Sequence, residues 1–163
     1  KRAWEIEDLD LGEPVALEIY NTQFGAFIDA RFAGVKAPVI VDTGASMVHL
    51  QPAVFGDIDP LPATEPALAS TVDGEIFAAT GTLDRVSSGN LSVRDVEFVT
   101  FESDQIASYN DEGIPLDGLI GASLLMRFAV TFNGKRGELI LQPYPDDDVD
   151  ELLEDFRESL QAP

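Results

Sequence analysis

The sequence of 163 residues contains no cysteine and a single histidine, His49. Without cysteine the chain can form no disulfide framework, no thiolate metal site and no cysteine nucleophile. One histidine excludes a multi-histidine metal cluster, and any Ser-His-Asp scheme would have to use that ring. The residues left for chemistry are therefore carboxylates and hydroxyls, and no metal site is expected.

Basic residues are also scarce, with 10 Lys and Arg against 30 Asp and Glu, a net charge of −20. Nucleic acids and anionic lipid surfaces are bound mainly through Lys and Arg, so neither is expected as a partner. No apolar run approaches the roughly 18 residues that a membrane-spanning helix needs, and we expect no membrane insertion by this segment. The sequence begins with Lys1 and not Met, which leaves room for an upstream signal or anchor.

The pattern of apolar residues predicts a mostly β domain spanning residues 1–163, with a core at about 15–145. Short β-type runs, several of which alternate apolar and polar residues, lie at 14–20, 26–32, 39–41, 96–101 and 138–141. Asp73-Gly74 and Asn133-Gly134 are pairs that favour two-residue hairpin turns. Hairpins are therefore expected to connect many of the strands.

Two further segments break this β pattern. Four prolines between Gln51 and Pro66 predict a surface loop without regular structure. Near the C-terminus, apolar residues at helical spacing follow three acids, which suit the positive end of a helix dipole. We expect an amphipathic helix at about 147–161 that docks one apolar face.

The sharpest chemical signal is the stretch Val39-Ile40-Val41-Asp42-Thr43-Gly44-Ala45-Ser46. An apolar strand ends directly in an acid, a hydroxyl, a glycine and small residues, a pattern typical of a tight turn that holds a carboxylate at the end of a sheet. Taken alone, such an Asp more often caps its own turn through backbone amides. A second signal is needed to favour a functional role for Asp42.

That signal is Leu116-Asp117-Gly118-Leu119-Ile120-Gly121-Ala122-Ser123-Leu124-Leu125, whose Gly-Ala-Ser repeats the one after Asp42. Together the two motifs resemble the retropepsin-like aspartic proteases, which carry an Asp-Thr-Gly-Ala turn and later an apolar-apolar-Gly segment leading into a short helix. The family places a flap hairpin between them, where this chain has residues 70–77. The resemblance covers about Tyr20 to Leu141 and is closest to the bacterial, cellular branch.

The resemblance implies a retropepsin-like closed β-barrel, with a short helix after Leu119-Ile120-Gly121. Asp42 would be the catalytic carboxylate, supported by Thr43, Gly44 and Ala45. Thr43 would hydrogen-bond across a subunit interface, and Gly44 would allow close backbone approach. The flap would comprise Val72, Asp73, Gly74 and Glu75, with Asp73 and Gly74 at its tip. Leu119, Ile120 and Gly121 would be structural, as would Asp117.

The chemistry of the family requires two carboxylates that share a proton, and this chain supplies one Asp-Thr-Gly. The resemblance therefore implies an aspartic endopeptidase that hydrolyses peptide or protein substrates as a homodimer, without a cofactor. A catalytically silent peptide-binding or regulatory module of the same fold is the alternative. A carboxylate-pair glycosidase is a weaker reading, because no motif places a second acid.

Three secondary expectations follow from single residues. Ala45 stands where many pepsin-like enzymes carry a hydroxyl, so fewer donors stabilise the carboxylate anion and we expect an activity optimum less acidic than pepsin's. His49 is expected to be a packed or surface histidine, with a pH sensor as the alternative. Lys1 at the start and the bacterial-type resemblance favour the envelope or periplasm, with the cytoplasm as the alternative.

The termini depart from the family pattern. Retroviral-type dimers join short terminal strands into a shared sheet, whereas this chain has an acidic segment from Glu5 to Glu13 and a helical C-terminus. The resemblance therefore does not predict which segments of this chain form the dimer interface.

Overall fold

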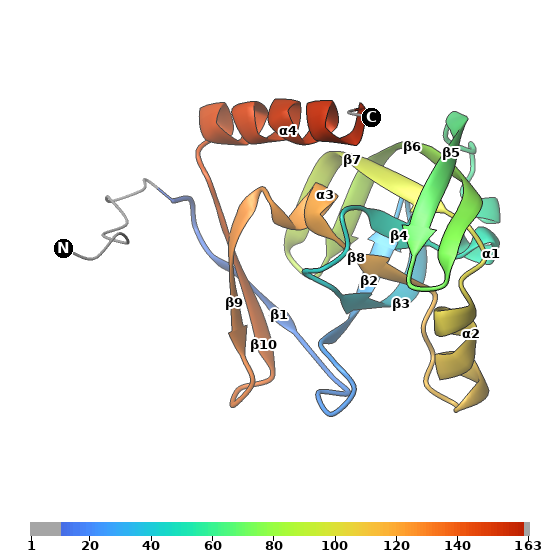
Figure 1. The fold of residues 1–163 in the computed structure, drawn as a ribbon. Helices are drawn as coiled ribbons and strands as arrows, with labels where there is room; N and C mark the ends of the chain where they lie inside the picture. Colours follow the sequence, from blue (N-terminus) through green and yellow to red (C-terminus); the bar gives the residue numbers. More distant parts are fainter. Residues whose placement is uncertain (1–10, 162–163) are drawn as a thin grey trace.

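The computed structural model describes residues 11–161, so Lys1 and most of the acidic segment from Glu5 to Glu13 lie outside the described residues. As predicted, the fold is mostly β (Figure 1). The strands are β1 (Val15–Glu18), β2 (Phe27–Phe32), β3 (Val35–Val41), β4 (Val48–Leu50), β5 (Thr64–Thr71), β6 (Gly74–Ser88), β7 (Leu91–Thr100), β8 (Gly118–Ile120), β9 (Phe128–Asn133) and β10 (Glu138–Pro143). The helices are α1 (Pro52–Gly56), α2 (Asp104–Asp111), α3 (Ala122–Leu125) and α4 (Asp146–Gln161).

Six strands close into the expected barrel. They are hydrogen-bonded in the order β2-β3-β8-β4-β7-β6, and pairing of Arg31 with Ser87 and of Phe32 with Val86 joins β6 back to β2. Alternation in β2 sends Ile28, Ala30 and Phe32 to one face, where each is at most 3% exposed and part of the main core. Closure removes the sheet edges of these strands, and β5 remains outside the barrel, where β6 is its single strand partner among residues 11–161.

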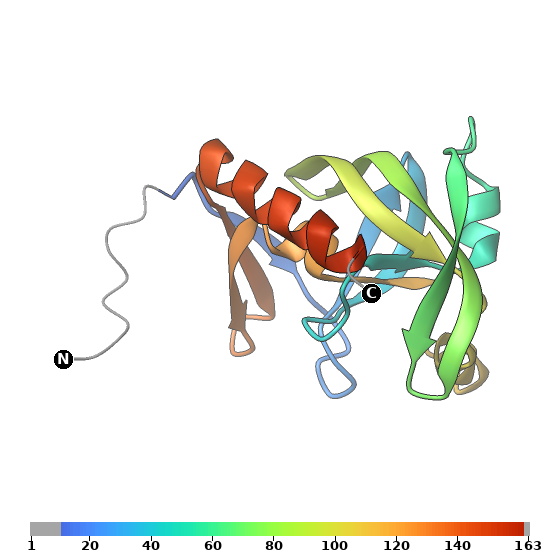
Figure 2. The same cartoon turned by 45° about the horizontal axis from the view of Figure 1, so that its top comes forward.

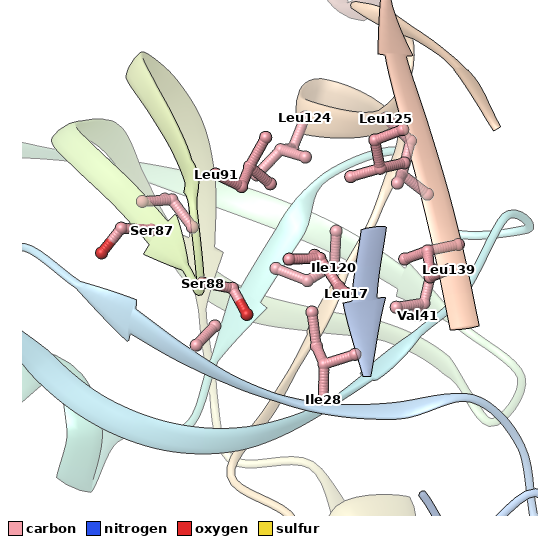
Figure 3. A pocket seen from close by; sticks show the side chains of 13 residues that line it. Leu17, Ile28, Val41, Ser87, Ser88, Leu91, Ile120, Leu124, Leu125 and Leu139 are labelled. Atoms are coloured by element: carbon pink, nitrogen blue, oxygen red, sulfur yellow. The ribbon is translucent and has the colours of Figure 1, made fainter. Parts of the chain in front are cut away.

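A second, three-stranded sheet with the order β1-β10-β9 packs against one side of the barrel. Figure 3 shows Leu17 and Leu139 of this sheet facing Ile28, Val41 and Ile120 of the barrel. The apolar cavity between them has a volume of about 10 Å³, which is about the minimum that holds one water molecule. The two sheets therefore share a packed core and not a ligand pocket.

The segment 51–66 is more regular than its prolines predicted, and the expectation of a wholly irregular loop was wrong. Pro52 begins α1, where proline lacks only an amide hydrogen that the first turn would leave unpaired. Pro66 lies in β5, an edge strand, where a missing donor interrupts no central ladder. The sequence interpretation also missed α2, which Ser103 caps by accepting a hydrogen bond from Ile106 N at 3.3 Å.

The predicted C-terminal helix is present as α4, and Figure 1 shows it above α3 and β7. Docking rests on Leu153, which is 6% exposed, and on an ion pair between Arg157 and Glu97 of β7. Leu152 and Leu160 stay largely exposed, so only part of the apolar face is buried. None of the helices between residues 11 and 161 has the length and apolarity needed to cross a membrane.

Two turns differ from their predicted form. Thr71 pairs with Gly74, which places Val72 and Asp73 at the flap tip and Gly74 at the start of β6. The expected tip of Asp73 and Gly74 is therefore displaced by one residue. Asn133 pairs with Glu138, so a four-residue connection replaces the expected two-residue turn, and Gly137 adopts the positive φ of 64°.

Candidate active site

Asp42 is the first residue after β3, at the carboxyl end of a strand buried in the barrel. Val39 and Val41 are at most 8% exposed, and β3 runs parallel to β8 with Val41 opposite Ile120. The Asp42 N–H donates to the Ile120 carbonyl at 2.9 Å. The two motifs found in the sequence therefore lie side by side, and the second one positions the backbone of Asp42.

The turn itself is organised around the Asp42 carboxylate. Gly44 N donates to Oδ1 of Asp42 at 2.8 Å, and Ala45 N donates to the Asp42 carbonyl at 3.3 Å. This is the local capping contact expected for a purely structural Asp, yet the carboxylate remains exposed to solvent. Thr43 is also exposed, and its hydroxyl makes no hydrogen bond within residues 11–161. The turn therefore exposes the Asp42 carboxylate and the Thr43 hydroxyl at the end of β3.

The repeated Gly-Ala-Ser of the second motif braces this turn from below. Ala122 N donates to the Ala45 carbonyl at 2.8 Å, and Ser123 N donates to the Ser46 carbonyl at 3.0 Å. A Cβ on Gly121 would lie 2.3 Å from the Met47 carbonyl oxygen and 2.8 Å from that of Ala45. Only glycine therefore allows the two segments to approach this closely.

Ser123 is a supporting residue that sequence reasoning did not assign. Its side chain is fully buried, and Oγ accepts a hydrogen bond from Val48 N at 2.9 Å while donating to the Glu97 carbonyl at 2.7 Å. One hydroxyl therefore links α3 to β4 and β7. The sequence feature that could have drawn attention to Ser123 is the repeated Gly-Ala-Ser, in which Ser123 corresponds to Ser46.

The segment predicted to form a flap lies in the hairpin of β5 and β6. At its tip, Thr71 Oγ1 accepts from Asp73 N at 3.2 Å and donates to the Gly74 carbonyl at 2.9 Å. Figure 2 shows the hairpin projecting from the barrel on the same side as the connection between β3 and β4. Val72 is 91% exposed and Phe77 is 88% exposed. No hydrogen bond joins this tip to the Asp42 turn within the described chain.

Two other titratable residues singled out in the sequence differ in burial, since His49 is buried and Asp117 is only partly buried. His49 is 3% exposed, its Nε2 lies 2.9 Å from the Phe101 carbonyl, and its ring stacks on Phe101. Burial lowers the pKa of His49, and the contact with the Phe101 carbonyl partly opposes this. Burial raises the pKa of Asp117, whose backbone bonds to Pro38 and Gln51.

One surface depression lies away from Asp42. It has a volume of about 230 Å³ and is lined by Asp29, Lys36 and neighbouring residues of β2, β3 and 87–89. Across residues 11–161 no three His, Asp or Glu side chains are grouped so that they could hold a metal ion. The site of one chain therefore consists of one exposed carboxylate on a braced turn.

A sequence search of curated proteins found no match. The family model described as aspartyl protease matches residues 28–124, which include both motifs and the flap. A retropepsin-like aspartic protease from Rickettsia conorii superposes with a TM-score of 0.53 at 27% identity, covering 80% of this chain and 98% of that one.

A second solved structure, EIAV protease complexed with the inhibitor HBY-793, matches with a TM-score of 0.50 at 12% identity. This match covers 66% of the present chain and 90% of that protein, and it supports the fold alone. The family match spans more than half of the chain. The chain therefore belongs to the retropepsin-like aspartyl protease family.

Proposed function

We propose that this protein is an aspartic endopeptidase whose active form is a homodimer with two Asp42 carboxylates facing each other across a twofold axis. The observation that carries the proposal is the exposed Asp42 carboxylate on a turn fixed by β8 and α3. A carboxylate this well braced and still open to solvent is suited to meet an identical group. The exposed Thr43 hydroxyl, without a partner among residues 11–161, is suited to bond across the same axis.

Two such carboxylates at about 3 Å share one proton, because both cannot ionise at that distance. The ionised Asp42 would take a proton from a water molecule while the oxygen of that water bonds to the carbonyl carbon of the substrate. The protonated Asp42 would at the same time donate its proton to the carbonyl oxygen. Collapse of the tetrahedral intermediate would then break the carbon–nitrogen bond, with a proton passing to the leaving amine.

The substrate would be an extended peptide held between the turns and the two flaps. An extended chain can pair its backbone with a flap hairpin, while side chains decide specificity. Val72 and Phe77 are the most exposed apolar side chains of the hairpin. They favour substrates with apolar side chains next to the cleaved bond, since closing the flap would remove both from water.

The test replaces Asp42 with Asn, which keeps the size of the side chain and removes its charge. We expect cleavage of a peptide library to fall by roughly 10²–10⁴-fold while folding is retained. Asp84→Asn is the matched control, because Asp84 is also an exposed aspartate and lies in β6. Unchanged turnover in Asp42→Asn would remove Asp42 from the mechanism.

The same assay separates the enzyme from a silent peptide-binding module. A wild-type dimer that binds a statine-type transition-state mimic and cleaves no library peptide would support the module. Cleavage that the mimic inhibits and that Asp42→Asn abolishes would support the protease.

A further inference from the structure

One side of α4 leaves apolar side chains uncovered in the described part of the chain. The helix docks through Leu153, which is 6% exposed, and through the ion pair of Arg157 with Glu97. At 3.6 residues per turn, Arg157 lies about 40° around the helix axis from Leu153. These two residues therefore determine which side of α4 faces the barrel.

The other four apolar residues of α4 all lie to one side of Leu153, the side away from Arg157. We call them the apolar stripe of α4: Val149, Leu152, Phe156 and Leu160. At the same helical spacing, the stripe turns away from Leu153 by between about 20° and about 100°. Leu152 is 42% exposed and Leu160 is 46% exposed. An apolar helix face usually packs against another segment, and residues 11–161 leave this one partly open.

The first described residues of the chain lie beside the start of this helix. Gly12 N donates to the Pro143 carbonyl at 2.9 Å, and α4 begins at Asp146, shortly after Pro143. β1 runs antiparallel to β10, with Val15 opposite Leu141. Followed backwards from Val15, the chain therefore advances along β10 toward α4. Figure 1 shows this part of the chain next to the connection between β10 and α4.

Residues 1–10 lie outside the described residues and are joined to the chain at this point. They read Lys-Arg-Ala-Trp-Glu-Ile-Glu-Asp-Leu-Asp and include the only tryptophan of the chain, Trp4, together with Ile6 and Leu9. A chain of ten residues spans at most about 33–36 Å, and the 16 residues of α4 span about 24 Å. The segment is therefore long enough to follow α4 from its first turn to its last.

The charges of the segment and the helix fit this direction. A segment that begins beside the first turn of α4 and follows the helix would bring Lys1 and Arg2 to the last turn. That turn contains Glu158 and has no basic residue. The carbonyl groups at the C-terminal end of a helix also favour nearby cations. The two basic residues of the segment would therefore meet the end of α4 that attracts them.

We propose that residues 1–10 bind along the apolar stripe of α4 in the same molecule, with Trp4 in contact with the stripe. In an extended segment side chains alternate, which would direct Trp4 and Ile6 to the helix and Glu5 and Glu7 to solvent. Covering the tryptophan and the stripe removes apolar surface from water, which favours the docked state. α4 would then be held between the barrel and this segment. The docking is independent of the proposed protease activity.

Trp4 reports on this contact directly, because all tryptophan fluorescence of the chain comes from that residue. The measurement is acrylamide quenching of the full chain at several protein concentrations, with a synthetic peptide of residues 1–10 as the exposed reference. We expect weaker quenching and an emission maximum at shorter wavelength in the full chain than in the peptide. Equal quenching and equal emission in the two would overturn the proposal.

Two variants place a charge on the stripe, Leu152→Asp and Leu160→Asp. In each, quenching of Trp4 should rise toward the value of the peptide, and the emission maximum should move to longer wavelength. Leu68→Asp is the matched control, because Leu68 is also an exposed leucine and lies in β5, not on the stripe. It should leave both values unchanged. All three leucines are exposed, so circular dichroism should show that each variant still folds.

The remaining outcomes separate this contact from other positions of the segment. Protection of Trp4 that persists in both stripe variants would overturn the contact with α4. Protection that is lost on dilution would overturn docking within one molecule and indicate a second copy as the partner.

Amide hydrogen exchange gives an independent readout of the same contact. Trp4→Ala in the full chain should speed exchange in α4 and leave exchange in the barrel strand β2 unchanged, because only the helix loses a covering segment. Unchanged exchange throughout α4 would overturn the proposal. None of these measurements uses peptide cleavage, so a failure of the proposed protease activity would leave their results unaffected.

Discussion

Ser123→Ala tests whether one buried hydroxyl holds the support of the active-site turn together. The substitution removes the acceptor of Val48 N and the donor to the Glu97 carbonyl, at 2.9 and 2.7 Å, from a fully buried position. A buried donor left without a partner costs about 1–3 kcal/mol, and losing the second hydrogen bond costs about 0.5–1.5 kcal/mol. We expect the free energy of unfolding to fall by roughly 2–4 kcal/mol.

Urea unfolding at one fixed protein concentration measures this change, because the stability of the proposed dimer would depend on concentration. The shift of the midpoint at an unchanged slope gives the difference in free energy. Ser92→Ala is the control, since Ser92 is exposed and its hydroxyl accepts only from Arg85. It should change the free energy by no more than about 0.5 kcal/mol.

A loss below about 1 kcal/mol in Ser123→Ala would refute this reasoning, because it would mean that Val48 N finds another partner at little cost. The amide of residue 123 still donates to the Ser46 carbonyl in the variant. The substitution therefore separates the hydroxyl's contribution to stability from the backbone contact that braces the Asp42 turn.

Two further predictions concern pH. Burial lowers the pKa of His49 below its ordinary 6.5, so the unfolded chain binds a proton more readily; relative to His49→Gln, wild-type stability should be constant above about pH 6.5 and fall as the pH drops to 5. A stability difference between wild type and His49→Gln that stays the same in urea unfolding at several pH values would contradict this. For the proposed protease, Ala45→Ser adds a hydroxyl donor beside the carboxylates and should move the acidic limb of the pH–rate profile to lower pH. A wild-type maximum near about pH 2, the acidic range of pepsin, would refute the premise.

The parts of the fold that could be predicted are those with a strong local pattern. Val39 to Asp42 combines an apolar strand with turn residues, and the structure places β3 and its turn there. A hairpin was expected at 70–77, and the turn between β5 and β6 lies within these residues. The apolar spacing from Val149 to Leu160 likewise predicted α4. In each case the signal lies within a few residues and needs no distant partner.

The parts that could not be predicted depend on contacts between distant segments. α2 buries a single residue, Ile106, so it has almost no amphipathic pattern to detect. Pro52 was taken as a breaker because sequence alone does not say whether a proline begins a helix or ends one. The role of Ser123 follows from its contacts with β4 and β7, which are set by topology. The residue at the flap tip depends on register, which a one-residue shift changes.

The support of the Asp42 turn comes from a segment that is far away in the sequence. Val41 of β3 pairs with Ile120 of β8, and the hydrogen bond from Val48 N to Ser123 joins residues that are 75 positions apart. A long loop must close before such contacts can form. A nascent chain that has not yet reached Ser123 lacks the segment that fixes the Asp42 backbone. A partly synthesised chain therefore lacks the support of the candidate site, which is complete only when the last strand of the barrel, β8, and the following helix α3 are present.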